Sequence, residues 1–433
     1  MNNEKNRLIP DLRFPEFANA EEWSIKDFGE LIKLLADFTA NGSFASLKEN
    51  VTYFSTEEYA VLVRTTDLDK KIFIPARFTD KRGYDFLSKT SLFGNEIVMA
   101  NVGSIGKVFR VPYFKKPMTL APNTYVLKFN DFVDEDFIYQ LMLRFVFEQK
   151  LLSMVGSSTL MAINKSNLRS IKVEIPTLVE QQKIASCLSS LDELITAQKE
   201  KLELLQNHKK GLMQNLFPQE GEIVPKFRFP EFENDGEWEN IPLKDLSEVI
   251  TKGTTPTSLG FSYVDCGVNF IKIESIIDGK INLNKAAFIT NECNDVLKRS
   301  QLKENDILLS IAGALGVVTT VNKDILPANT NQALSIIRLH NENQKDYLKA
   351  FLKSNQISQE INKIKAGAAQ PNISLNQVQN FRILIPKNII EQEKIASCLS
   401  SLDELILSQT EKIEQLQSHK KGLMQGLFPK IID

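Results

Sequence analysis

The sequence predicts an α+β protein in which two globular domains are joined by two long helices, which form an antiparallel coiled coil within one chain. Three observations support this. A 39-residue stretch occurs twice, at 180–218 and 391–429, and 31 of its positions are identical. The motif Arg-Phe-Pro-Glu-Phe also occurs twice, at 13–17 and 228–232. The segments between these repeats are strand-rich and differ in sequence. The chain therefore has an internal pseudo-two-fold repeat.

The 39-residue repeat has the spacing of a coiled-coil helix, because its apolar residues recur at alternating steps of three and four. Gln198, Lys209 and their repeats fill the skipped positions. The predicted seam consists of Ile184, Leu188, Leu191, Ile195, Leu202, Leu205, Leu212 and Leu216, with Ile395, Leu399, Leu402, Ile406, Ile413, Leu416, Leu423 and Leu427. A zipper between two chains would show the same pattern, but two near-identical helices in one chain favour pairing within it.

Both ends of each helix carry sequence signals. Thr177 precedes Glu180 by three residues, which is the spacing of an N-cap residue and its reciprocal acid, and Asn388 precedes Glu391 in the same way. A proline marks the end of each predicted helix, because proline cannot continue a helix. The predicted divisions are a first domain at 1–176, a first helix at 177–218, a second domain at 219–386 and a second helix at 387–433.

The two globular segments share landmarks. Residues 95–100, followed by Gly103 and Gly106, parallel residues 305–310, followed by Gly313 and Gly316. Each set predicts a buried strand that enters a glycine turn. Final strands are expected at 171–175 and 382–385, directly before the helices.

Composition excludes several classes of protein. The formal net charge of −2 over 433 residues is not that of a basic nucleic-acid coat. No apolar run is long enough to span a membrane, and the N-terminus lacks the apolar core of a signal peptide. The four cysteines form no zinc-ligand pattern. We therefore expect a reduced, cytoplasmic protein with no membrane association and no bound metal.

No catalytic motif is present. Gly103-Ser-Ile-Gly-Lys107 is followed by Val108 rather than by serine or threonine, so it is not a phosphate-binding loop. The chain also lacks any Pro-Pro pair, which the Asn/Asp-Pro-Pro-aromatic loop of an amino-methyltransferase requires. We expect a non-catalytic chain that binds no cofactor.

The first globular segment contains a basic region. Residues 64–128 hold twelve basic and five acidic side chains. Such an excess attracts phosphates, although it also fits a solvated surface. The candidate DNA-binding residues are Arg64, Lys70, Lys71, Arg77, Lys81, Arg82, Tyr84, Lys107, Arg110, Lys115 and Lys116.

The second segment has no basic excess, and its candidates are polar turns. Asn and Gln side chains can pair with adenine, and hydroxyls can hold phosphate, although such turns are also common as plain connections. The candidate DNA-binding residues are Lys252, Thr254, Thr255, Thr257, Lys272, Asn329, Asn331, Gln332, Gln370 and Asn372.

Taken together, these features resemble the DNA specificity subunit of type I restriction–modification systems. The resemblance is strongest where a Pro-x-x-x-Glu-Gln segment leads into an Ile-x-x-x-Leu-x-x-Leu-Asp helix, at 176–195 and 386–406. The 251–257 turn and the strand and turn at 306–316 also resemble features of the target-recognition domains. The first half departs from the pattern, because no Gly-x-Thr-Pro turn follows Trp23.

The resemblance implies that each domain reads one part of a two-part, asymmetric sequence in double-stranded DNA, and that the helices set the unread spacer. It also implies two modification subunits that bring S-adenosylmethionine, and restriction or translocase subunits that use ATP and Mg²⁺. We expect the two modification subunits to dock beside the seam, although core filling would explain the same residues. The docking candidates are Leu194, Met213, Phe217, Leu405, Met424 and Phe428.

Two alternatives remain. The chain could be a coiled-coil scaffold with two domains for ligands other than DNA, or a self-sufficient DNA-modifying enzyme. A steep salt dependence of DNA binding would distinguish the first, and methyl transfer by the chain alone would support the second.

Overall fold

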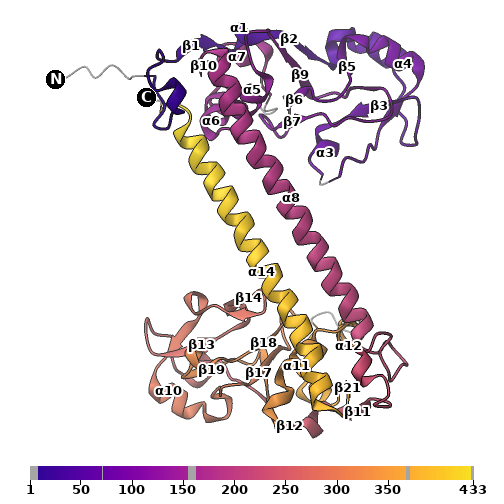
Figure 1. The fold of residues 1–433 in the computed structure, drawn as a ribbon, viewed down its shortest axis with the longest axis vertical. Coiled ribbons are helices and arrows are strands. Elements are labelled where there is room, and N and C mark those ends of the chain that lie inside the picture. The colour runs from indigo at the N-terminus through magenta and orange to yellow at the C-terminus, as the bar shows by residue number, and fades with distance from the viewer. Residues whose placement is uncertain (1–7, 71, 155–161, 367–370, 431–433) are drawn as a thin grey trace, which may run out of the picture. The chain divides into compact units, whose positions relative to one another are not determined.

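A computed structural model describes residues 8–70, 72–154, 162–366 and 371–430 (Figure 1). The chain divides into two compact units. Unit 1 comprises Met1–Gln198 with Lys412–Asp433, and unit 2 comprises Lys199–Glu411. Each unit therefore combines one globular domain with the beginning of one long helix and the end of the other.

Unit 1 is built on two four-stranded sheets and one two-stranded sheet. The first has the order β2-β9-β6-β7, the second β4-β3-β8-β5, and β1 pairs with β10. All pairs are antiparallel except β3 with β8. The strands are β1 Ser24–Asp27, β2 Ile32–Asp37, β3 Ala60–Val63, β4 Phe78–Thr79, β5 Ser91–Leu92, β6 Ile97–Ala100, β7 Val108–Arg110, β8 Met118–Leu120, β9 Thr124–Phe129 and β10 Lys172–Ile175. The short helices are α1 Phe28–Leu31, α2 Phe44–Asn50, α3 Thr65–Leu68, α4 Lys81–Phe86, α5 Glu135–Met142, α6 Phe145–Ser153 and α7 Lys165–Arg169.

Unit 2 repeats this plan with different loops. Its sheets are β12-β20-β17-β18, β16-β13-β19, β11-β21 and β14-β15, and β13 with β19 is the parallel pair. The strands are β11 Glu239–Pro242, β12 Ser247–Lys252, β13 Val268–Ile271, β14 Ile276–Ile277, β15 Lys280–Ile281, β16 Ala287–Ile289, β17 Ile307–Ser310, β18 Val318–Thr320, β19 Ala328–Thr330, β20 Leu334–Leu339 and β21 Arg382–Ile385. The short helices are α9 Leu243–Leu246, α10 Asn291–Val296, α11 Lys345–Leu352, α12 Asn355–Ala366 and α13 Leu375–Gln379. The predicted landmark strands are β6 and β17, and the four glycines after them have positive φ.

The two long helices are α8, Leu178–Leu216, and α14, Ile389–Gly426. In unit 1 the first turns of α8 share a core with Leu427 and Phe428, which follow α14, and Lys420 pairs with Asp192 at 2.6 Å. In unit 2 the last turns of α8 share a core with the first turns of α14, and Lys209 pairs with Asp403 at 2.5 Å. The beginning of each helix thus meets the end of the other, which confirms the predicted antiparallel pairing within one chain.

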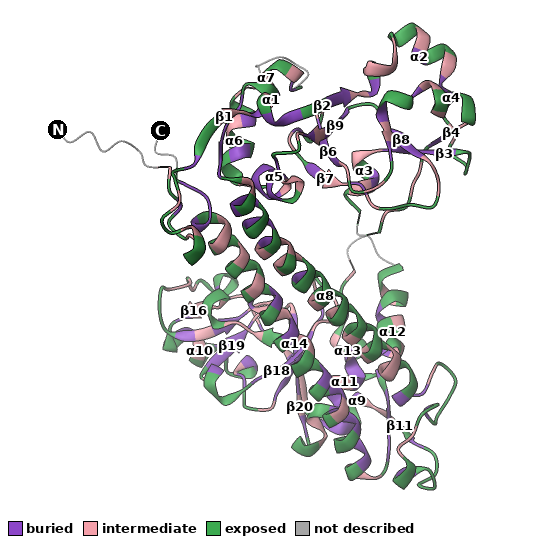
Figure 2. Cartoon of the chain, turned by 45° about the horizontal axis from the view of Figure 1, so that its top comes forward, coloured by how far each residue is buried: buried purple, intermediate pink, exposed green. Residues whose placement is uncertain are grey.

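Burial along the seam is deepest near the helix ends. Leu188 is 0% exposed and Leu399 is 2% exposed, whereas Leu205 and Leu416 are half-buried. Figure 2 shows buried residues concentrated in the sheets, and exposed residues along the long helices. A two-helix contact covers only one side of each helix, so the central seam residues keep some contact with water. No helix among the described residues is both long and apolar enough to cross a membrane.

The Arg-Phe-Pro-Glu-Phe motif holds the start of the long helix. Arg13 donates from Nε and Nη2 to the Glu180 carboxylate at 2.8 and 2.7 Å, and Glu16 pairs with Lys183 at 2.9 Å. Arg228 makes the same two bonds to Glu391, each 2.8 Å long. The predicted capping role of Glu180 and Glu391 is therefore wrong. Their carboxylates are 1% exposed, and bind a buried guanidinium instead of a backbone N–H.

Candidate nucleic-acid interface

The clearest polar cluster in unit 2 lies where the parallel strands β13 and β19 end. Ile271 is paired with Thr330 in this register, so the residues that follow both strands emerge at one edge. Lys272 follows β13, and Asn331 with Gln332 follows β19. The structure therefore brings together three of the predicted residues from segments about sixty positions apart.

The 251–257 loop is fixed against the same edge. Gly253 donates its N–H to Asn331 O at 3.1 Å, and Thr255 Oγ1 donates to Gln332 Oε1 at 2.5 Å. A Cβ at Gly253 would lie 1.8 Å from Thr330 O, so only glycine permits this approach. We name Lys252, Thr254, Thr255, Lys272, Asn331 and Gln332 the unit 2 edge cluster.

Two further residues border the cluster and were missed in the sequence. Arg299 donates from Nη2 to Lys252 O at 3.5 Å, and Tyr263 lies under the Lys272 ammonium, 4.0 Å from Nζ to the ring centroid. Neither residue belongs to a sequence motif, so only the folded structure shows that they lie beside the cluster.

Three predicted residues of unit 2 are not placed in this cluster. Asn329 is 0% exposed, and its Nδ2 donates to Asn294 Oδ1 and Leu297 O, so the prediction that it contacts DNA is wrong. Thr257 is exposed in the turn that follows the cluster. Asn372 is exposed beside Ile373, whose N–H donates to Ile311 O. Gln370 lies outside the described residues.

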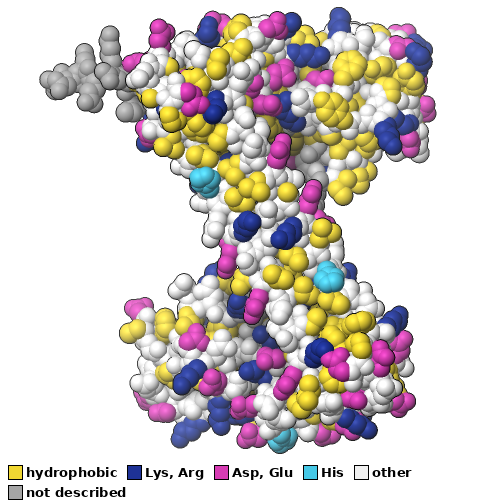
Figure 3. Space-filling view, viewed as in Figure 1, with side chains coloured by type: hydrophobic (Ala, Val, Ile, Leu, Met, Phe, Trp, Pro, Cys, Tyr) yellow, Lys and Arg dark blue, Asp and Glu magenta, His cyan; other side chains and the backbone are white. Residues whose placement is uncertain are grey.

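The basic region of unit 1 is largely paired with acids. Six of its described candidates form ion pairs: Arg64 and Lys70 with Asp67, Lys81 with Asp85, Lys107 with Asp69, Arg110 with Asp136, and Lys116 with Glu57. Glu57 and Asp136 lie outside the 64–128 window, which is why counting within that window overstates the positive charge. Figure 3 shows basic and acidic side chains interspersed on the face in view.

The remaining candidates of unit 1 are held differently. Arg77 and Lys115 are exposed. Arg82 donates to Asn50 Oδ1 at 2.9 Å, and the Tyr84 ring packs against Tyr59 with centroids 5.8 Å apart. Lys71 lies outside the described residues.

The unit 1 counterpart of the edge cluster is a cleft that sequence reasoning missed. In the parallel pair β3 and β8, Val63 is paired with Leu120, so Arg64 and Asn123 lie near the same strand ends. A cleft of about 800 Å³ there is lined by residues that include Thr39, Lys48, Tyr53, Asn101 and Asn123. The repeat in the sequence could have predicted this cleft. Strand β2 of unit 1 corresponds to strand β12 of unit 2, and the loop after β12 borders the edge cluster.

The docking candidates separate into two kinds. Leu194 and Leu405, at repeat-equivalent positions on α8 and α14, are 42% and 54% exposed. Met213 and Met424 are half-buried against the two domain cores. Phe217 and Phe428 are 1% and 0% exposed and pack against aromatic rings of those cores, so their predicted docking role is wrong.

No cluster of metal-ligating side chains occurs within the described ranges. The fold and its two loop-bearing edges define a two-domain recognition protein built on one repeated helical frame. The chain belongs to the family described as type I restriction modification DNA specificity domain, whose sequence profile matches residues 20–207 and 235–418. It is thus a specificity subunit, the non-catalytic, DNA-recognition component of such a system.

Relatives agree over most of the chain. It is 28% identical over 311 residues to the type I restriction enzyme MjaVIII specificity subunit of Methanocaldococcus jannaschii, which covers 69% of this chain and 70% of that one. It is 25% identical over 424 residues to a putative MjaX specificity subunit of the same organism, covering 94% and 93%. A crystal structure of a type I restriction–modification S subunit from M. genitalium matches with a TM-score of 0.60 at 16% identity, over 98% of this chain and 100% of that one, and shows the same fold.

Proposed function

We propose that each unit reads one part of a two-part DNA sequence, and that the long helices set the gap between the parts. The observation that carries the proposal is the repeat itself. Two units share one frame, down to the Arg13–Glu180 and Arg228–Glu391 pairs, but carry different side chains at the equivalent strand edges. A repeated scaffold whose strand-edge residues differ between the two units is what two domains that recognise different DNA sequences would require.

The unit 2 edge cluster has the chemistry for direct reading of bases. Asn331 Oδ1 accepts from Ala333 N, and Gln332 Oε1 accepts from Thr255, which leaves each amide NH₂ able to donate. Acceptors such as guanine O6 and N7 and adenine N7 line the major groove. Lys252 and Lys272 supply the charge that holds phosphates.

In unit 1 we assign the corresponding role to the cleft lined by Thr39 and Asn123 rather than to the whole basic region. Thr39, Asn101 and Asn123 supply hydroxyl and amide groups there, and Lys48 supplies a charge. Arg77 and Lys115 remain candidates for phosphate contacts, because both are exposed.

We further propose that two modification subunits dock on the frame, one near Leu194 and one near Leu405. Both leucines are exposed at equivalent positions of the repeat, so the frame would offer two alike contacts, one for each partner. The partners would bring S-adenosylmethionine for adenine methylation and ATP with Mg²⁺ for restriction. The assembly would work in the cytoplasm.

Methylation mapping tests this function. Cells that carry the chain with its modification subunit should methylate adenines in one two-part motif, and cells that lack the chain should not. An unchanged methylation pattern would contradict the proposal. Binding of the purified complex to its motif should also weaken steeply with salt, which a scaffold for other ligands would not show.

A further inference from the structure

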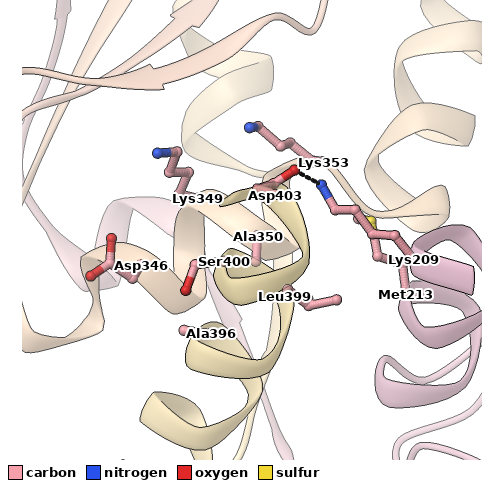
Figure 4. Close-up of a pocket in the computed structure, with 10 residues that line it drawn as sticks. All are labelled: Lys209, Met213, Asp346, Lys349, Ala350, Lys353, Ala396, Leu399, Ser400 and Asp403. Atoms are coloured by element: carbon pink, nitrogen blue, oxygen red, sulfur yellow. Dashed lines mark hydrogen bonds and ion pairs between the residues drawn. The ribbon is translucent and has the colours of Figure 1, made fainter. Parts of the chain in front are cut away.

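A small pocket in unit 2 lies between α8, α11 and α14 (Figure 4). Its volume is about 60 Å³, and its charged lining consists of Lys209, Lys349, Lys353, Asp346 and Asp403. At roughly 10–15 Å³ for each water, this space holds about four to six waters. It can therefore admit a group such as sulfate or phosphate, but not a nucleotide.

The positive charges of the pocket exceed the carboxylates that could neutralise them. Lys209 binds Asp403 at 2.5 Å. Lys349 has one long contact, 3.5 Å from Nζ to Thr320 Oγ1. Lys353 Nζ has no hydrogen bond or ion pair with any residue that the structure describes. Three lysines against two aspartates leave the lining with a net charge of +1.

Both lysines are half-buried. Burial, together with the charge of the nearby Lys349, lowers the pKa of Lys353 to about 8. Burial also lowers the pKa of Lys349, while Asp346 and Asp403 oppose that change. Partial desolvation of two neighbouring ammonium groups is unfavourable, and an anion bound between them would offset that cost.

The frame does not require these lysines. In unit 1 the repeat of Asp403 is Asp192, which is satisfied by Lys420 at 2.6 Å and by Gln140 Nε2 at 2.8 Å. The helices α5 and α11 correspond through Phe137 and Tyr347, which pack on Phe428 and Phe217. Tyr139 therefore occupies the place of Lys349, and Leu143 that of Lys353.

We propose that the pocket of unit 2 binds a small oxyanion of the sulfate or phosphate class between Lys349 and Lys353. Ser400 lies in the same lining, but its hydroxyl donates to Ser397 O at 3.1 Å, so the two lysines carry the site. The site belongs to one half of the repeat only, so it makes the two halves of the frame chemically different. This inference does not depend on the proposed function.

Calorimetric titration of the full chain with inorganic sulfate at constant ionic strength tests the site. We expect one site with a dissociation constant of about 1 mM or tighter. The variant K349Y/K353L, which carries the residues of unit 1 at these positions, should fold and bind at least about tenfold more weakly, because charge-assisted hydrogen bonds are lost. K244M removes one exposed charge of the same unit and should bind as the parent does.

Raising the pH gives a second readout. Sulfate stays a dianion throughout, so binding should weaken as the pH rises above about 8, where Lys353 loses its proton. Absence of saturable binding by the parent chain would overturn the proposal. Binding by K349Y/K353L within twofold of the parent would also overturn it.

Discussion

Arg13→Met should destabilise unit 1 by about 3–5 kcal/mol, the usual cost of removing one partner from a buried ion pair. The Glu180 carboxylate is 1% exposed and accepts both guanidinium bonds, and also Trp23 Nε1 at 3.3 Å. The hydrogen bond to Glu180 raises the pKa of Arg13, as expected for a strong pair. Without Arg13, that carboxylate is buried and loses its counter-ion.

The two tryptophans of the chain provide the assay. Trp23 lies beside the pair in unit 1, and Trp238 lies in unit 2. In a Trp238→Phe background, fluorescence during thermal unfolding reports unit 1 alone. For a unit of this size, 3–5 kcal/mol lowers the midpoint by about 6–20 °C.

A double-mutant cycle separates the pair from its surroundings. Arg13→Met with Glu180→Met removes both charges and should recover most of the loss, apart from about 1 kcal/mol for the Trp23 bond. Lys183→Met is the control, because its pair with Glu16 is half-exposed and should contribute less than about 1 kcal/mol. If Arg13→Met stays within 1 kcal/mol of the parent, or the double variant is no more stable than the single one, the reasoning is refuted.

Three further predictions concern the proposed function. Leu194→Asp and Leu405→Asp should each lower the number of bound modification subunits from two to one without loss of folding, as counted by native mass spectrometry. A saturated parent complex that holds only one modification subunit would contradict this. Gly253→Ala should relax recognition of one half of the motif in methylation maps, because the Cβ of the new alanine would lie 1.8 Å from Thr330 O and displace the loop. Unchanged recognition of both halves would show that the loop does not read DNA. One added heptad after Gln198 and another after Gln409 lengthen each helix by about 10.5 Å, which corresponds to up to roughly three base pairs. The spacer should therefore grow by one to three base pairs, or activity should be lost. Full activity at the original spacer would show that the helices do not set the spacer length.

The fold was predictable where the signal was local or repeated. The heptad period predicts the long helices, and their near-identity predicts pairing within one chain. The glycine turns after β6 and β17 predict the buried strands before them. Each of these signals lies within a few residues of the structure that it specifies, or recurs in the second copy.

The candidate site was less predictable, because its chemistry depends on partners far apart in sequence. Arg110 is neutralised by Asp136, and Arg13 finds Glu180 across 167 positions. Asn329 looks like a polar turn residue, but it lies in a buried strand. The repeat did contain an unused signal for the buried pair, because the arginine and the glutamate recur together in both copies.

Domain exchange tests the central claim of two independent readers most directly. Residues 24–170 are replaced by the corresponding segment of a relative that recognises a different sequence, and genomic methylation is mapped in cells that carry the hybrid. We predict that one half of the two-part motif changes, while the other half is retained. A simultaneous change in both halves would contradict the account.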